Sequence, residues 1–229
     1  MELLHNGFSL DTPAGTFPLS TDSMLLAHFV RLSKDARVLD LGSGCGTLGL
    51  LLCAKDSGCH VTGIELEAAA HNAALENITR NGLQDRMESI FADLRDLNGA
   101  FAPGSFCCCV SNPPYFHGGA AHRQTPTARS TDTCTTADLF SAAQRALKFG
   151  GDFYLVHKPE ALASLCGQGS ATGLEPKRLC LVRHSPDRPI SMLLLHCKKG
   201  GKPGLQLEEL CLFTEKGDPT PEYKQIYHL

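Results

Sequence analysis

The sequence predicts an α/β protein in which a mostly parallel sheet carries helices on both faces. From residue 36 onward, short β-branched or apolar runs alternate with segments of helical apolar spacing, the pattern of strands joined by crossover helices. A glycine-rich turn, GSGCG at residues 42–46, ends the first of these runs. With 229 residues, 42% of them apolar, the chain can bury one substantial core. We expect a single domain over residues 1–229, with residues 1–35 as an N-terminal cap and residues 36–229 as the core sheet.

The apolar spacing predicts seven strands and four helices. The expected strands are residues 37–41, 60–65, 87–91, 106–111, 152–156, 178–183 and 192–197, the last two as a hairpin. The expected helices are residues 22–32, 47–54, 67–80 and 136–148. Thr21 or Asp22 could cap the first helix. Asn81-Gly82 and Gly150-Gly151 are expected to end the last two helices, because these residue types tolerate a left-handed cap.

The composition excludes several classes of protein. A net charge of −3 argues against a surface coated in positive charge for indiscriminate nucleic-acid binding. The 11 cysteines include no C-x-x-C pair and no zinc-finger spacing, so free thiols and no metal site are expected. No segment reaches the ~20 apolar residues that span a bilayer. We therefore expect a cytoplasmic monomer that binds neither a metal nor a membrane.

A nucleoside cofactor site is predicted where the first three strands end. The glycine turn lets the backbone approach a ligand that side chains would exclude, as in proteins that bind dinucleotides or S-adenosylmethionine (SAM). Glu65 suits ribose hydroxyls, and Asp93 with Leu94 suits an adenine ring. Asp40 would attract the charged methionine part of SAM and repel a pyrophosphate, which disfavours NAD. The predicted cofactor-binding residues are Asp40, Gly42, Ser43, Gly44, Gly46, Glu65, Leu66, Asp93, Leu94 and Asn112.

The strongest chemical signal is the tetrapeptide Asn112-Pro113-Pro114-Tyr115 after the fourth expected strand. An amide-like or exocyclic nitrogen is a poor nucleophile because its lone pair is delocalised. An enzyme that methylates it must accept hydrogen bonds from its N–H groups. The Asn112 side-chain oxygen and the Pro113 carbonyl are acceptors that the proline pair holds rigidly, and Tyr115 can stack on a flat acceptor. These four residues are the predicted catalytic residues, and in-line transfer needs no His or Lys base.

The motifs DLGSGCG, GIELE, ADL and SNPPY, in that order, resemble those of the class I SAM-dependent methyltransferases. This resemblance implies a Rossmann-like fold and SAM as the cofactor, and NPPY resembles the branch that methylates amino groups. The segments TDSMLLAHF, NPPYFHGG and CKKGGKPGLQ resemble those of the bacterial tRNA adenine-N6 methyltransferases that act on valine tRNA. The resemblance implies tRNA as the partner and N6-methylation of an adenosine in the anticodon loop.

Basic side chains supply candidate RNA contacts. Residues 177–202 carry seven Lys or Arg side chains, opposed within that range only by Asp187. Such a run can bind phosphates or form a solvated face. A long polar segment, residues 116–135, contains two arginines that could contact the backbone near a splayed-out base. The predicted RNA-binding residues are Arg123, Arg129, Lys158, Lys177, Arg178, Arg183, Lys198, Lys199 and Lys202.

Several other functions are compatible with parts of this pattern. NPPY also occurs in enzymes that methylate a glutamine amide of release factors, but those carry an extra N-terminal helical domain, for which about 36 residues before the first strand are too few. A DNA adenine methyltransferase would need a target-reading insertion. A non-catalytic SAM-binding or RNA-binding module would not need the Asn112 acceptor, and an NAD-dependent oxidoreductase would be stabilised by NAD instead of SAM.

Overall fold

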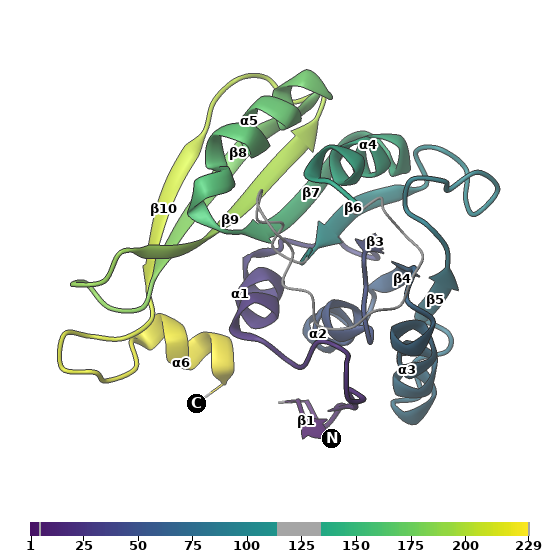
Figure 1. Cartoon of the computed structure of the whole chain (residues 1–229), viewed down its shortest axis with the longest axis horizontal. Helices are drawn as coiled ribbons and strands as arrows, with labels where there is room; N and C mark the ends of the chain where they lie inside the picture. The colour runs from purple at the N-terminus through teal and green to yellow at the C-terminus, as the bar shows by residue number, and fades with distance from the viewer. Residues whose placement is uncertain (5, 114–133, 229) are drawn as a thin grey trace.

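The computed structural model describes residues 1–4, 6–113 and 134–228. Within them an eight-stranded sheet has the order β10-β8-β9-β7-β6-β3-β4-β5, and β1 and β2 form a separate two-stranded ladder (Figure 1). Strands β3 to β7 are parallel, β9 runs antiparallel to β7 and β8, and β10 runs parallel to β8. The strands are β1 (Glu2–Leu3), β2 (Ser9–Leu10), β3 (Arg37–Leu41), β4 (His60–Glu65), β5 (Met87–Phe91), β6 (Phe106–Ser111), β7 (Leu147–His157), β8 (Leu174–Arg183), β9 (Ile190–Lys199) and β10 (Gln206–Cys211).

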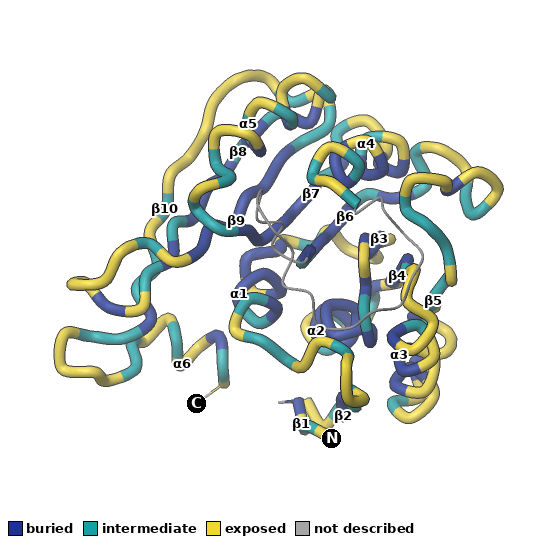
Figure 2. Tube along the Cα trace, in the orientation of Figure 1, coloured by how far each residue is buried: buried dark blue, intermediate teal, exposed yellow. Residues whose placement is uncertain are grey.

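Helices cover both faces of the sheet, as the sequence predicts (Figures 1 and 2). One buried apolar cluster joins the sheet to α1, α2, α3 and α6, and a second joins its other face to α4 and α5. The helices are α1 (Thr21–Phe29), α2 (Thr47–Lys55), α3 (Ala68–Arg80), α4 (Thr136–Ala146), α5 (Leu162–Ala171) and α6 (Pro221–Tyr227), with a 3-10 turn at Pro159–Ala161. None of the described helices is long and apolar enough to cross a membrane.

The sequence places the parallel half of the sheet well and the C-terminal half less well. The predicted bounds of β3 to β6 coincide with those of the structure. The predicted total of seven strands was too low by one, because β10 adds an eighth at the edge of the sheet beside β8. The helix α5 and the β1–β2 ladder were also missed.

The predicted start and end of α1 and the predicted end of α4 were wrong, and α1 ends at Phe29 instead of residue 32. The N-cap of α1 is Ser20, whose side chain accepts a hydrogen bond from the Ser23 N–H, and not Thr21 or Asp22. Helix α4 ends at Ala146, and β7 begins at the next residue. Gly150-Gly151 therefore lies inside a strand, where Gly150 has a φ of +76°. A glycine that permits an irregular strand and a glycine that ends a helix give the same signal in the sequence.

The register of the parallel strands brings their carboxyl ends to one edge of the sheet. Leu41 of β3 lies opposite Ile64 of β4, and Glu65 of β4 lies opposite Phe91 of β5. On the other side of β3, Asp40 pairs with Val110 of β6. The segments that follow β3, β4, β5 and β6 therefore leave the sheet at the same edge, the position where open α/β sheets bind ligands.

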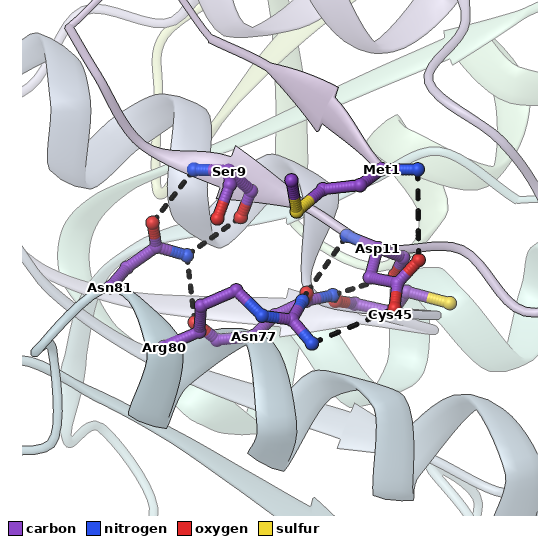
Figure 3. Close-up of polar contacts among 7 residues, drawn as sticks. All are labelled: Met1, Ser9, Asp11, Cys45, Asn77, Arg80 and Asn81. Carbon is purple, nitrogen blue, oxygen red and sulfur yellow. Dashed lines mark hydrogen bonds and ion pairs between the residues drawn. The ribbon is translucent and has the colours of Figure 1, made fainter.

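A buried asparagine ties the N-terminal segment to this edge (Figure 3). Asn77 of α3 is fully buried. Its side-chain oxygen accepts from the Asp11 N–H at 2.9 Å, and its amide donates to the Asp11 carbonyl at 2.9 Å and to the Cys45 carbonyl at 3.0 Å. Asn81, the C-cap residue directly after α3, exchanges two hydrogen bonds of 2.7 Å with the backbone of Ser9. The glycine turn and residues 9–11 are thus held to one helix.

We predict that Asn77→Ala lowers the free energy of unfolding by roughly 2 to 4 kcal/mol, because it leaves buried backbone groups at Asp11 and Cys45 without partners. Urea denaturation of the variant and wild type measures this difference. Asn72→Ala, an exposed position of the same helix, is the matched control and should change stability by less than about 1 kcal/mol. Equal effects of the two substitutions would contradict the prediction.

Candidate active site

The glycine turn after β3 is fastened to the end of β4. Gly42 N–H and Ser43 N–H both donate to the Ile64 carbonyl at 3.0 Å. Gly42 and Gly44 have φ values of +74° and +55°, with open space where a Cβ would lie. At Gly63 of β4, a Cβ would lie 2.6 Å from the Ser43 hydroxyl oxygen. The turn therefore needs glycine at Gly42 and Gly44 for its backbone conformation. Strand β4 needs glycine at Gly63 because the turn approaches it closely.

Glu65 holds the same turn from the end of β4. One carboxylate oxygen accepts from the Gly44 N–H at 2.7 Å, and the other accepts from the N–H groups of Leu66 at 2.8 Å and Glu67 at 2.7 Å. These three bonds fix the carboxylate beside the glycines, where the sequence predicts a ribose-binding acid. Leu66, also predicted to contact the cofactor, is half exposed.

Asp40 places an unpartnered carboxyl group beneath the turn. It is buried, and among the described residues neither carboxyl oxygen has a hydrogen-bond partner. Burial, together with the nearby negative charge of Glu65, raises the pKa of Asp40 to about 8. A buried acid without donors is costly, so a cationic or hydrogen-bond-donating ligand would be stabilised here. The donors and charge of SAM fit this position, and the phosphates of a dinucleotide do not.

Asp93 and Leu94 follow β5 at the same edge. Arg95 donates to both oxygens of Asp93, at distances of 2.6 to 3.0 Å, and this hydrogen bonding holds the pKa of Asp93 below its usual value. Leu94 packs against the apolar cluster beneath α4. The predicted adenine-binding pair therefore lies at the correct edge, with its carboxylate held by an arginine that the sequence did not single out.

Asn112 follows β6, next to the glycine turn. Its strand is tied to β3 by the Ser111 hydroxyl, which donates to the Leu41 carbonyl at 2.8 Å. The Asn112 side-chain amide donates to the Ser23 hydroxyl of α1 at 3.0 Å, and the neighbouring Pro113 is buried. The other two predicted catalytic residues, Pro114 and Tyr115, lie outside the described residues, as do Arg123 and Arg129.

The structure shows acidic partners for two of the predicted RNA-binding residues. Arg178 is buried and bonds Glu208 at 2.8 and 3.0 Å, and Arg183 forms an ion pair with Glu209. Both glutamates belong to β10, whose pairing with β8 the sequence did not reveal. The run of basic residues is therefore opposed by more than Asp187, and Arg178 has a structural role.

The predicted RNA-binding lysines occupy two edges of the sheet. Lys158 directly follows β7 at the edge of the candidate site. Burial raises the pKa of Asp22 in α1, and the positive charge of Lys158 offsets part of this rise. Lys198, near the end of β9, bonds Asp152 in the middle of β7, and Lys199 at the end of β9 donates to the Leu147 carbonyl at the opposite edge of the sheet. Lys177 donates to the Lys202 carbonyl at that same distant end. Of these five lysines, Lys158 alone lies at the edge that carries Asp40 and Asn112.

The sequence matches the methyltransferase small domain family over residues 19–164. The chain belongs to this family. The match covers α1, the glycine turn, Glu65, Asp93 and Asn112, so the residues that meet at the carboxyl edge lie within it. The methyltransferase predicted from the sequence is confirmed.

Curated relatives match most of the chain. A protein of Photobacterium profundum named tRNA1(Val) (adenine(37)-N6)-methyltransferase is 29% identical over 90% of this chain and 88% of its own length. A protein of the same name from Dickeya chrysanthemi is 32% identical over 80% of this chain and 74% of its own. A third, from Bacteroides fragilis, is 31% identical over 77% and 75%.

Solved structures share the fold at lower identity. A protein of Agrobacterium tumefaciens described as a predicted O-methyltransferase superposes with a TM-score of 0.76 at 21% identity, covering 91% of this chain and 96% of its own. The geranyl diphosphate C-methyltransferase of Streptomyces coelicolor, solved with S-adenosyl-L-homocysteine, has a TM-score of 0.57 at 14% identity, covering 77% of this chain and 78% of its own. These likenesses confirm the Rossmann-like methyltransferase fold.

We predict that Asp40→Asn, without cofactor, stabilises the protein more at pH 8 than at pH 5. The raised pKa means that the folded state holds a proton that the unfolded state releases above about pH 4. The wild type therefore loses stability as the pH rises from about 4 toward 8, whereas the neutral amide does not. Urea denaturation at both pH values should show the variant's relative gain exceeding about 1 kcal/mol. The exposed control Asp85→Asn should show no such trend, and a pH-independent difference for Asp40→Asn would refute the assignment.

Proposed function

We propose that this chain transfers a methyl group from SAM to N6 of an adenosine in tRNA, in the anticodon loop of a valine tRNA. The observation that carries the proposal is the juxtaposition of Asn112 with the glycine turn, because it sets an amide acceptor beside the edge that carries Asp40 and Glu65. An adenine amino group is an exocyclic nitrogen of the kind that such an acceptor serves.

The residues at the edge suit SAM. Glu65 would accept from the ribose, Asp93 and Leu94 would contact the adenine, and Asp40 would face the positively charged methionine part. When bound, SAM supplies an electrophilic methyl group on a sulfonium. The open space at Gly42 and Gly44 lets the backbone approach the ligand without a side chain in between.

The acceptor side is organised by the end of β6. The Asn112 side-chain oxygen and the Pro113 carbonyl would accept hydrogen bonds from the target amino group, which keeps its lone pair directed at the methyl group. No proton needs to leave before transfer, so positioning by rigid acceptors replaces a general base. The burial of Pro113 limits competing water at this point.

Three further observations favour tRNA. The relatives that match over most of the chain are named for adenine in a tRNA, and Lys158 offers a cation at the edge that holds Asn112, where a phosphate next to an extruded base would lie. The 11 free cysteines suit the reducing cytoplasm, where tRNA is found. No cluster of metal-binding side chains occurs in the described part of the chain, and the proposed reaction uses none.

The proposal is tested by offering methyl-labelled SAM together with bulk tRNA, bulk DNA or a release factor, followed by nucleoside analysis of labelled RNA. We expect the label in tRNA, recovered as N6-methyladenosine. Bulk tRNA from which the valine tRNAs have been removed should take up little label. Label confined to protein or DNA would overturn the acceptor assignment.

We predict that Asn112→Ala lowers kcat for methyl transfer at least about 100-fold, a loss typical of removing one preorganised transition-state partner. Its dissociation constant for SAM, measured by calorimetry, should change less than about threefold, because the cofactor's main partners belong to other strands. Retention of wild-type transfer by this variant would refute the mechanism. The far-surface variant Lys148→Ala, at an exposed position near the start of β7, is expected to keep wild-type transfer at saturating tRNA.

A further inference from the structure

We propose that Ser23 of α1 is a positioning residue that sets which way the Asn112 amide points. This inference rests on the proposed function. The Ser23 hydroxyl would not touch the amino group that is methylated, and would act on it by orienting Asn112. The two residues are 89 positions apart in sequence and are joined by one hydrogen bond, from Asn112 Nδ2 to Ser23 Oγ at 3.0 Å.

The direction of this bond matters because an asparagine amide has two chemically opposite ends. Its oxygen accepts hydrogen bonds, and its nitrogen only donates them. Methylation of an amino group requires the oxygen to face the incoming N–H groups. Because Nδ2 donates to Ser23, Oδ1 is the atom that can accept hydrogen bonds from the target amino group. A rotated amide would present N–H groups to N–H groups, which is repulsive.

A second serine lies within hydrogen-bond distance of Ser23. The Ser20 hydroxyl lies 3.2 Å from the Ser23 hydroxyl and also accepts from the Ser23 N–H at 3.3 Å, which makes Ser20 the N-cap of α1. When the Ser23 O–H donates to Ser20, a lone pair of Ser23 remains for Asn112. Ser23 is only 5% exposed, so water has little room to replace this arrangement.

The helix that carries Ser23 is held firmly at its other end. The Lys55 ammonium donates to the carbonyls of Ala27, His28 and Val30 at 2.6 to 2.9 Å, which satisfies the C-terminus of α1. Phe29 lies against Tyr154 of β7 with ring centroids 5.9 Å apart, and the Arg178 guanidinium stacks over Phe29 at 4.3 Å. Ser23 is therefore presented to Asn112 from a rigid support.

The test compares Ser23→Ala and Ser23→Thr with wild type, and uses Ser141→Ala as the matched control, since Ser141 is an exposed helical serine of α4. We expect Ser23→Ala to lower kcat roughly tenfold, the value of one orienting hydrogen bond. KM for tRNA and the dissociation constant for SAM should stay within about threefold. Ser23→Thr keeps the hydroxyl and should recover most of kcat, and Ser141→Ala should match wild type.

A second readout does not depend on turnover. In ¹⁵N–¹H spectra, the side-chain amide signal of Asn112, identified by its absence in Asn112→Asp, should exchange its protons with solvent faster in Ser23→Ala than in wild type or Ser23→Thr. Unchanged exchange, or a wild-type kcat for Ser23→Ala, would overturn the inference. A fall in kcat matched by equal losses of SAM affinity and thermal stability would also overturn it, because that pattern indicates general packing. A wild type that transfers no methyl group to any acceptor would defeat the proposed function, and the exchange measurement would still decide the role of Ser23.

Discussion

The candidate site depends on a few hydrogen bonds that attach the glycine turn after β3 to the end of β4. The Ile64 carbonyl accepts from two consecutive N–H groups, and the Glu65 carboxylate accepts from a third N–H of the turn and from two of its own strand's continuation. These bonds exist because β3 and β4 pair in register up to Leu41 and Ile64. If β3 and β4 paired one residue out of register, side chains such as Asp40 and Glu65 would point to the opposite face of the sheet, and the site would not form. The geometry of this edge therefore depends on the pairing of β3 with β4.

The same edge concentrates groups that reduce stability. Asp40 is buried without a hydrogen-bond donor, and the Ser43 hydroxyl is buried without a partner among the described residues. In the described chain, buried polar atoms without a hydrogen-bond partner also occur away from the glycine turn, at Gln168 and His196, whereas buried Arg178 is paired with Glu208. Asp40 differs from these residues because neither oxygen of a buried carboxyl group is paired, so a ligand that donates hydrogen bonds would compensate its burial. The fold tolerates them because two large apolar clusters cover both faces of the sheet.

The sequence predicts the parallel strands and the turn residues well because their signals are local. Strand β6 is an uninterrupted run of apolar residues up to Ser111 and is buried at every position except Cys107, and the turn glycines follow β3 directly. It predicts less where the deciding contact comes from far along the chain. No residue of the edge strand β10 is buried, and its apolar residues do not alternate with polar ones as in a half-buried strand, so neither its pairing with β8 nor the partners of Arg178 and Arg183 could be foreseen. Helix α5 is rich in small residues that favour no single structure. The Ser23–Asn112 bond follows no sequence periodicity, although the helix that carries Ser23 was predicted.

The Asn77 contacts shown in Figure 3 also have a consequence for synthesis on the ribosome. The backbone of Asp11 finds its partners on a helix residue made 66 positions later. During translation the backbone of Asp11 therefore stays without this partner until the glycine turn, β4 and most of α3 have been made, whereas the local β1–β2 ladder can pair earlier. Contacts with this long sequence separation form slowly, so residues 9–11 dock onto α3 late in the folding of the first half of the sheet.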